Sequence, residues 1–179
     1  MDFPFDLVPF WLHAGPDRWF SRDDDFDRML RDRFGEAHLH AARREFDGWS
    51  ASPDGALALV LLLDQIPRNI YRDSAHAYAT DGLARLFAAR AITVGFDANV
   101  DPALRVFFYL PFEHSETPAD QERSIALVQA MGDANYLGYA IAHRDVIARF
   151  GRFPHRNAAL GRTNTAEEQA WLDAGGGFG

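Results

Sequence analysis

The segment Pro-Phe-Glu-His-Ser-Glu at residues 111–116 combines two carboxylates with an imidazole. It directly follows the aromatic run Val-Phe-Phe-Tyr-Leu at residues 106–110. An ionised side chain buried beside so much apolar surface is costly unless a charged or hydrogen-bonding partner compensates it. Glu113 and His114 are therefore the candidate catalytic residues, because a carboxylate and an imidazole held in such a setting can transfer protons.

Three interpretations of the Glu113–Glu116 pair remain open. Its i,i+3 spacing places both carboxylates on one face of a helix, and Pro111 predicts a kink just before them because it cannot donate a backbone hydrogen bond. Arg105 and Arg123 could neutralise the two carboxylates, a nearby histidine could exchange protons with one of them, or both could chelate a metal ion. The chain lacks a standard metal-binding spacing such as His-Glu-x-x-His, so we expect no metal site.

A second polar string, Leu-Leu-Leu-Asp-Gln-Ile-Pro-Arg-Asn, occupies residues 61–69. Asp64 and Arg68 are four residues apart, a favourable spacing for an ion pair if the helix is not bent or ended by Pro67. Such a pair would tie the end of this helix to its neighbour. In the functional interpretation, Arg68 and Asn69 instead donate hydrogen bonds into a pocket at the helix end.

A third string, Arg-Phe-Gly-Arg-Phe-Pro-His-Arg-Asn at residues 149–157, is rich in hydrogen-bond donors. A loop of this composition suits a carboxylate or phosphate ligand, but it could equally clamp helix carbonyls and internal carboxylates. In the helix before it, His143 lies on the apolar stripe, where a histidine is either a hydrogen-bonded core residue or part of a site. The candidate ligand-binding residues from the three strings are Asp64, Arg68, Asn69, Glu116, His143, Arg152, His155, Arg156 and Asn157.

The composition narrows the possible partners and compartments. The 179 residues carry a net charge of −8, which argues against nucleic acid or an anionic membrane as a partner. The chain has no cysteine and all 18 basic residues are arginine, so disulfides, thiolate metal sites and a Schiff-base lysine are excluded. The longest apolar run, Ala56–Leu63, is too short to span a bilayer, and residues 1–4 lack the basic start of a signal peptide. We therefore expect a cytoplasmic protein.

Apolar residues recur at three- and four-residue spacing almost throughout, which predicts an all-α protein. Ser52-Pro53, Asp133 and the capping box that begins at Thr165 are typical helix starts, and no segment shows the alternation of a strand. Short linkers favour an antiparallel α-hairpin array in a single domain over residues 1–174, followed by a flexible glycine-rich tail at 175–179. Helices are expected over residues 25–46, 56–66, 81–94, 118–131 and 133–150, with another from 101 and a short one after 165.

The three polar strings together resemble the bacterial domain-of-unknown-function family numbered 924. The resemblance rests on LLLDQIPRN, on FFYLPFEHSE followed by DQERS, and on HRDVIARFGRFPHRN followed by LGR. Phe10-Trp11 and Trp19-Phe20 also resemble the opening of that family, although Pro9 stands where an acidic residue is usual. The resemblance implies an all-α, tetratricopeptide-repeat-like fold, and it brings no established activity.

Two functions from different classes fit these observations. In the first, Arg68, Arg152 and Arg156 bind a small anionic metabolite in a pocket, and Glu113 and His114 supply acid–base chemistry. In the second, the domain is a helical-repeat interaction module that binds a peptide or a partner helix, and the polar residues form a structural network. A network without any pocket or groove is the remaining possibility. The sequence identifies no cofactor and no reaction.

Overall fold

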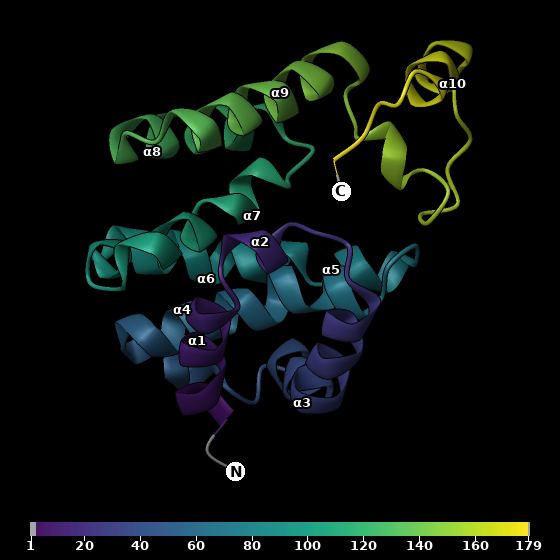
Figure 1. The fold of residues 1–179 in the computed structure, drawn as a ribbon. Coiled ribbons are helices and arrows are strands. Elements are labelled where there is room, and N and C mark those ends of the chain that lie inside the picture. Colours follow the sequence, from purple (N-terminus) through teal and green to yellow (C-terminus); the bar gives the residue numbers. More distant parts are fainter. Residues whose placement is uncertain (1–2, 179) are drawn as a thin grey trace. The chain divides into compact units, whose positions relative to one another are not determined.

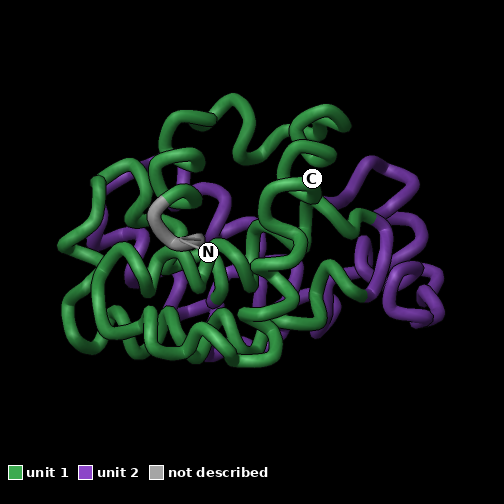
Figure 2. The backbone as a smooth tube through the Cα atoms, turned by 90° about the horizontal axis from the view of Figure 1, so that it is seen from below, with its two compact units in different colours: residues 1–72, 76–111 green, residues 73–75, 112–179 purple. Residues whose placement is uncertain are grey.

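The computed structural model describes residues 3–178 of the chain, and the side chains from residue 6 onward. Within residues 3–178 the secondary structure is helical, with turns and no strand, so the all-α prediction is confirmed. The chain forms two compact units, one of residues 1–72 and 76–111 and one of residues 73–75 and 112–179 (Figure 2). Compact units are not by themselves separate domains, so the single domain over residues 1–174 stays a prediction.

The first unit begins with helices α1 (Phe3–Ala14), α2 (Pro16–Trp19) and α3 (Asp24–Ala42), followed by a 3₁₀ turn at Asp47–Ala51. The start of α3 is fixed by Asp23, whose carboxylate accepts hydrogen bonds from two backbone N–H groups of the first turn. The indole of Trp19 donates to the backbone carbonyl of Trp11 at 2.6 Å, and both rings pack edge-on against Phe107. These aromatic rings form a large part of this unit's core.

The central helical segment of the first unit is almost entirely buried. It consists of α4 (Pro53–Val60), a π-helical turn (Leu61–Gln65) and α5 (Ile66–Ile70), and the predicted N-cap Ser52 accepts from Gly55 N–H at 3.3 Å. Pro67 does not end the helix as the sequence suggested it might. Instead the helix widens by one residue, because Pro67 has no N–H for the carbonyl four residues before it, and then continues.

The rest of the first unit consists of short helices joined by tight turns. A 3₁₀ turn at Ala75–Tyr78 leads into α6 (Asp81–Thr93), which ends before the left-handed Gly95, and a 3₁₀ turn at Phe96–Ala98 follows. The helix expected from residue 101 is a 3₁₀ helix at Pro102–Phe108, capped by Asp101, and only the short α7 (Leu110–Glu113) after it is α-helical. The change from the 3₁₀ helix to α7 falls at Tyr109, and the kink expected just before Glu113 stays a prediction.

The second unit is built on a hairpin of α8 (Pro118–Met131) and α9 (Ala134–Phe150), which run antiparallel (Figure 1). Gly132 makes the sharp turn at φ 83°, and Asp133 caps α9. A 3₁₀ turn (Pro154–Arg156) and α10 (Ala166–Asp173) follow, and the predicted capping box of Thr165 is present. The tetratricopeptide-repeat-like arrangement stays a prediction. Among residues 3–178, no helix has both the length and the apolar character needed to cross a membrane.

Candidate functional site

Arg68 is the centre of a buried ion cluster in the first unit. Its guanidinium binds the Asp81 carboxylate through two parallel hydrogen bonds of 2.9 Å, and Nη1 lies 3.1 Å from Asp64 Oδ1. Gln65 donates to the other Asp64 oxygen at 2.7 Å. The predicted Asp64–Arg68 ion pair is therefore confirmed, and it does tie the helix end to a neighbour, since Asp81 begins α6. One cation held by two carboxylates is a structural arrangement rather than an obvious receptor for an anion.

The π-helical turn beside this cluster leaves backbone carbonyls that the helix cannot satisfy. Pro67 has no N–H group to donate to the carbonyl of Leu63. Thr80 Oγ1 donates to this carbonyl instead, at 2.5 Å. The carbonyl of Leu62 accepts from His38 Nδ1 at 2.8 Å, because Ile66 N–H bonds to the residue five before it. Side chains from two other elements thus repair this turn.

Glu116 forms a closed ion pair in the second unit. Arg162 donates to both of its oxygens at 2.8 and 2.9 Å, and the N–H of Phe153 donates at 2.8 Å. Burial alone would raise the pKa of Glu116, but the hydrogen bonds from Arg162 and Phe153 outweigh burial and hold this pKa below its ordinary value. The carboxylate is anionic at neutral pH, and its partner lies 46 residues away in the sequence.

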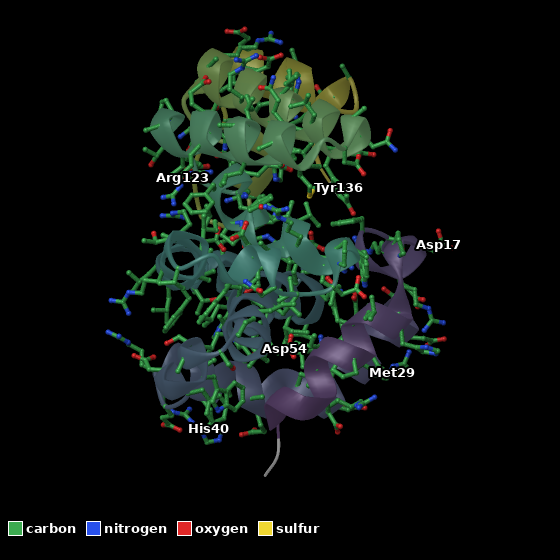
Figure 3. All side chains as sticks on the ribbon, turned by 90° about the vertical axis from the view of Figure 1, so that its left-hand side faces the viewer. Asp17, Met29, His40, Asp54, Arg123 and Tyr136 are labelled. Carbon is green, nitrogen blue, oxygen red and sulfur yellow. The ribbon has the colours of Figure 1, made fainter. Side chains whose placement is uncertain are left out.

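The interpretation in which Arg105 and Arg123 neutralise Glu113 and Glu116 was wrong. Arg105 binds Tyr109 Oη at 2.6 Å and Asp97 at 3.2 Å. The guanidinium of Arg123, labelled in Figure 3, lies 4.3 Å from the centre of the Phe112 ring as a cation–π contact. Helical spacing indicates which residues share a face of a helix. It does not indicate that Arg105 binds Tyr109 and Asp97 instead, or that Arg123 lies over the Phe112 ring.

Arg152 and Asn157 hold the start of α10. Arg152 binds Glu168 through two hydrogen bonds of 2.6 and 2.8 Å and the carbonyl of Thr163 at 2.9 Å. The hydrogen bond from Arg152, helped by the N–H of Thr165, lowers the pKa of Glu168 to about 2. Asn157 Nδ2 donates to the side chain of Asn164 at 2.7 Å. Both candidate ligand-binding residues therefore have partners within their own unit.

Glu113 and His143 form a buried pair in the second unit. His143 Nδ1 lies 3.2 Å from Glu113 Oε1 and 2.9 Å from the carbonyl of Tyr139, one turn earlier in α9. Because a carbonyl only accepts, Nδ1 carries the proton and donates it to the Tyr139 carbonyl, with the Glu113 carboxylate close by. His143 Nε2 therefore keeps its lone pair, and no hydrogen-bond partner from residues 6–178 is found there.

Three further basic groups surround this pair. The ring of His114 lies 6.3 Å from that of His143, and Arg156 Nη1 donates to the backbone carbonyl of His114 at 2.9 Å. The Arg156 guanidinium lies over the Phe153 ring, whose centre is 5.5 Å from that of His155. We call Glu113, His114, His143, His155 and Arg156 the histidine cluster. All five belong to the second unit and come from three separate segments of it.

Burial is the main reason that the pKa of His143 falls from 6.5 to about 3. The hydrogen bond to Tyr139 opposes this shift, and the positive charges of His114, Arg156 and His155 add to it. His143 is therefore neutral at pH 7. A neutral imidazole with a proton on Nδ1 offers Nε2 as a hydrogen-bond acceptor and, if its surroundings become more negative, as a base.

Phe178 in the C-terminal tail contacts two members of the histidine cluster. Its ring stacks on His143 with centres 3.6 Å apart and an angle of 16°, and it meets Phe153 and His155 edge-on. Nothing in the sequence predicts this contact, because residues 175–179 are expected to form a flexible tail. The flexible tail stays a prediction, and its last residue, Gly179, lies outside the described residues.

Gln121 is a second residue that sequence reasoning passed over. It is fully buried on α8, and its amide nitrogen donates to the carbonyls of Glu113 at 2.7 Å and Ser115 at 2.6 Å. It therefore fixes the backbone that carries the Glu113 side chain. The position of Gln121 in the string DQERS was the available signal for its importance. No residue spacing, however, predicts that a side chain will bind backbone carbonyls of another segment. Among the described side chains, no group of three or more histidine, aspartate or glutamate residues is arranged to hold a metal ion.

The sequence and the fold of this chain are similar to those of known proteins. A family model of bacterial proteins of unknown function, DUF924, matches residues 7–176, so the chain belongs to this family. It is similar to the solved structure of the protein of unknown function ATU0120 from Agrobacterium tumefaciens, with 53% sequence identity and a TM-score of 0.92. The similarity covers 96% of this chain and 97% of that chain. None of the curated proteins matches this chain.

Proposed function

We propose that the histidine cluster of the second unit binds the carboxylate or phosphate group of a small molecule, and that His143 accepts a proton when this anion is bound. The observation that carries the proposal is that two further imidazoles and one guanidinium gather around the buried pair of His143 and Glu113. Arginine is always charged and suits both anionic groups. Imidazoles add donors whose charge can adjust to the ligand.

The low pKa of His143 fits this role. Nearby positive charges are among its causes, so a bound anion that compensates these charges should raise the pKa. Anion binding would then be coupled to proton uptake at Nε2, next to the ligand. Glu113 Oε1 lies 3.2 Å from Nδ1, so the carboxylate stands on the Nδ1 side of the imidazole and Nε2 stays open to the ligand. In this proposal Glu113 is the orienting group and His143, rather than His114, exchanges the proton.

The other candidate ligand residues have structural roles in this proposal. Asp64, Arg68 and Asn69 belong to the helix end that Asp81 completes in the first unit, and Glu116, Arg152 and Asn157 hold the loops of the second. The ion pairs of the charged residues among them support the structural half of the alternative hypothesis, a helical-repeat module that binds a peptide. Tyr139 on α9 is 62% exposed, so this helix presents an aromatic residue at the surface that a peptide could contact. A cytoplasmic location, as expected from the sequence, also belongs to the proposal, and cell fractionation would test it.

Titration of the imidazoles by NMR tests the anion site directly. We expect phosphate or acetate, added at constant ionic strength, to raise the pKa of His143 and to raise the melting temperature. A ligand at 100 times its dissociation constant should add about 2.7 kcal/mol of stability. His143→Gln assigns the resonance, because glutamine keeps a donor but does not titrate.

Arg156→Gln should abolish the response to the anions, whereas Arg149→Gln, which removes an exposed arginine of the same unit, should leave it intact. If Arg156→Gln does not fold, His155→Asn serves the same purpose. A His143 pKa that no anion moves in the unmodified protein would reject the proposal. In that case a peptide-binding module with a structural polar network becomes the better account.

A further inference from the structure

The geometry points to a planar aromatic ring as the second part of the ligand: we propose that the slot now filled by Phe178 takes the ring of an aromatic carboxylate or aryl phosphate. This inference rests on the proposed function, because the anionic group of the same molecule would bind the histidine cluster. It adds the substrate class. It also makes the C-terminal tail an internal competitor that the ligand displaces.

The slot is bounded by flat groups on several sides. One wall is the His143 imidazole, stacked on Phe178 with centres 3.6 Å apart. Phe153 and His155 meet the Phe178 ring edge-on. Their ring centres lie 6.1 and 5.8 Å from the centre of the Phe178 ring, and the interplanar angles are 89° and 83°. Stacked and edge-on arrangements are those that aromatic rings prefer, and a saturated ring of similar size gains less from them. The slot therefore selects for a flat ring.

The present occupant is weakly attached. After α10, Gly176 N–H bonds to the carbonyl of Trp171 at 2.9 Å, and no backbone hydrogen bond from residues 3–178 reaches residue 177 or 178. Phe178 remains partly exposed, whereas Phe153, which forms the slot wall, is fully buried. The ring can thus leave without breaking a regular element of structure, while the wall stays in place.

Glycines set the path by which Phe178 reaches the slot. A Cβ atom at Gly176 would lie 2.3 Å from the indole of Trp171, so the tail can pass this ring only as glycine. Gly177 has φ +150°, which other residues rarely adopt. Substitution at Gly176 should therefore unseat Phe178 without changing any residue of the slot or of the histidine cluster.

The slot and the cationic groups share a wall. The Phe153 ring that meets Phe178 edge-on also lies under the guanidinium of Arg156, 4.5 Å from the ring centre. His155, another wall of the slot, is itself a member of the histidine cluster. A ring seated in place of Phe178 would thus carry its acidic group into a region with a permanent positive charge.

Calorimetric titration with four probes tests the inference. The probes are inorganic phosphate, phenyl phosphate, cyclohexyl phosphate and the neutral benzyl alcohol, each titrated into the full chain and into Phe178→Ala. We expect phenyl phosphate to bind Phe178→Ala about tenfold more tightly than it binds the unmodified protein, because the competing ring is gone. Phenyl phosphate should exceed cyclohexyl phosphate by about three- to tenfold. Inorganic phosphate should bind both proteins equally.

Two further variants control the experiment. Gly176→Ala should reproduce the gain for phenyl phosphate, and it replaces Phe178→Ala if that variant is unstable. Phe150→Ala removes a ring that packs on Trp171 and should give no gain. The inference is overturned if phenyl phosphate binds Phe178→Ala no more tightly than inorganic phosphate or cyclohexyl phosphate does. If benzyl alcohol binds Phe178→Ala as tightly as phenyl phosphate and inorganic phosphate binds neither protein, the proposed anion site is wrong and the aromatic slot stands.

Discussion

His38 in the first unit and His143 in the second are both buried imidazoles with lowered pKa values, and burial is the main cause in each. Both donate Nδ1–H to a backbone carbonyl, at 2.8 and 2.9 Å. The carbonyls differ, however. Leu62 has lost its helical partner at the π-helical turn, so His38 supplies a hydrogen bond that the fold needs. Tyr139 lies one turn before His143 within the regular helix α9, so its carbonyl does not depend on the imidazole.

The surroundings of the two rings differ in the same way. His38 Nε2 is sealed in the interior and has no hydrogen-bond partner among the described residues, next to the rings of Tyr71 and His76. His143 Nδ1 also lies 3.2 Å from Glu113 Oε1, and three other basic side chains lie near the ring. Burial and a shifted pKa therefore do not distinguish a structural histidine from a candidate for chemistry. The two kinds of histidine are distinguished by the carbonyl that accepts the Nδ1 proton and by the charged groups near the ring.

The largest effect should come from opening the ion cluster of the first unit. Arg68→Met removes the guanidinium that binds the buried Asp64 and Asp81 carboxylates, which should lower the free energy of unfolding by about 3–5 kcal/mol. Arg149→Met, at an exposed pair with Glu167, should change it by less than about 0.5 kcal/mol. Urea denaturation measures both. A loss below about 1 kcal/mol for Arg68→Met would show that this cluster is not the structural centre we describe.

A smaller effect should follow from removing one hydrogen bond at the π-helical turn. Thr80→Val keeps the shape of the side chain but leaves the Leu63 carbonyl buried and unsatisfied, at an expected cost of about 2 kcal/mol. Thr93 makes a similar hydrogen bond to the Ala89 carbonyl on the exposed face of α6, and Thr93→Val should be almost neutral. Equal losses for the two variants in urea denaturation would mean that the turn does not depend on side-chain repair.

Much of this fold was predictable because its signals are local. The caps Ser52, Asp133 and Thr165 identified helix starts from a side chain and the N–H groups two or three residues on. The Asp64–Arg68 pair was predictable for the same reason, since helical spacing alone brings its members together.

The candidate site was less predictable because its contacts are long-range. Glu116 and Arg162 are 46 residues apart, and nothing in their neighbouring residues indicates the pairing. The stacking of Phe178 on His143 depends on a path through glycines that composition presents as an unstructured tail. The wide turn before Pro67 depends on Thr80, which is 17 residues from its partner Leu63 in the sequence. Local rules thus predicted the helices and the residue types of the site, but not which of those residues meet.

The smallest effect, and the one that separates the two histidines, concerns pH. The folded pKa of His143 is about 3 and the ordinary value is 6.5, so between these values the unfolded chain binds a proton that the native protein does not. The stability linked to His143 is therefore complete above pH 6.5 and falls as the pH drops toward 3. Between about pH 6.5 and about pH 5.5 the loss should be about 1 kcal/mol. The lowered pKa of His38 gives a loss of the same sign.

Urea denaturation at several pH values should show a weaker acid dependence for His143→Gln and for His38→Gln than for the unmodified protein, because glutamine keeps a donor and does not titrate. Repeating the series with phosphate should distinguish the two histidines. An anion bound at the histidine cluster raises the native pKa of His143, so the part of the acid dependence that His143→Gln removes should shrink, while the part that His38→Gln removes stays the same. If phosphate changes both parts alike, the anion acts on the protein as a whole, and the distinction between a structural and a chemical histidine fails.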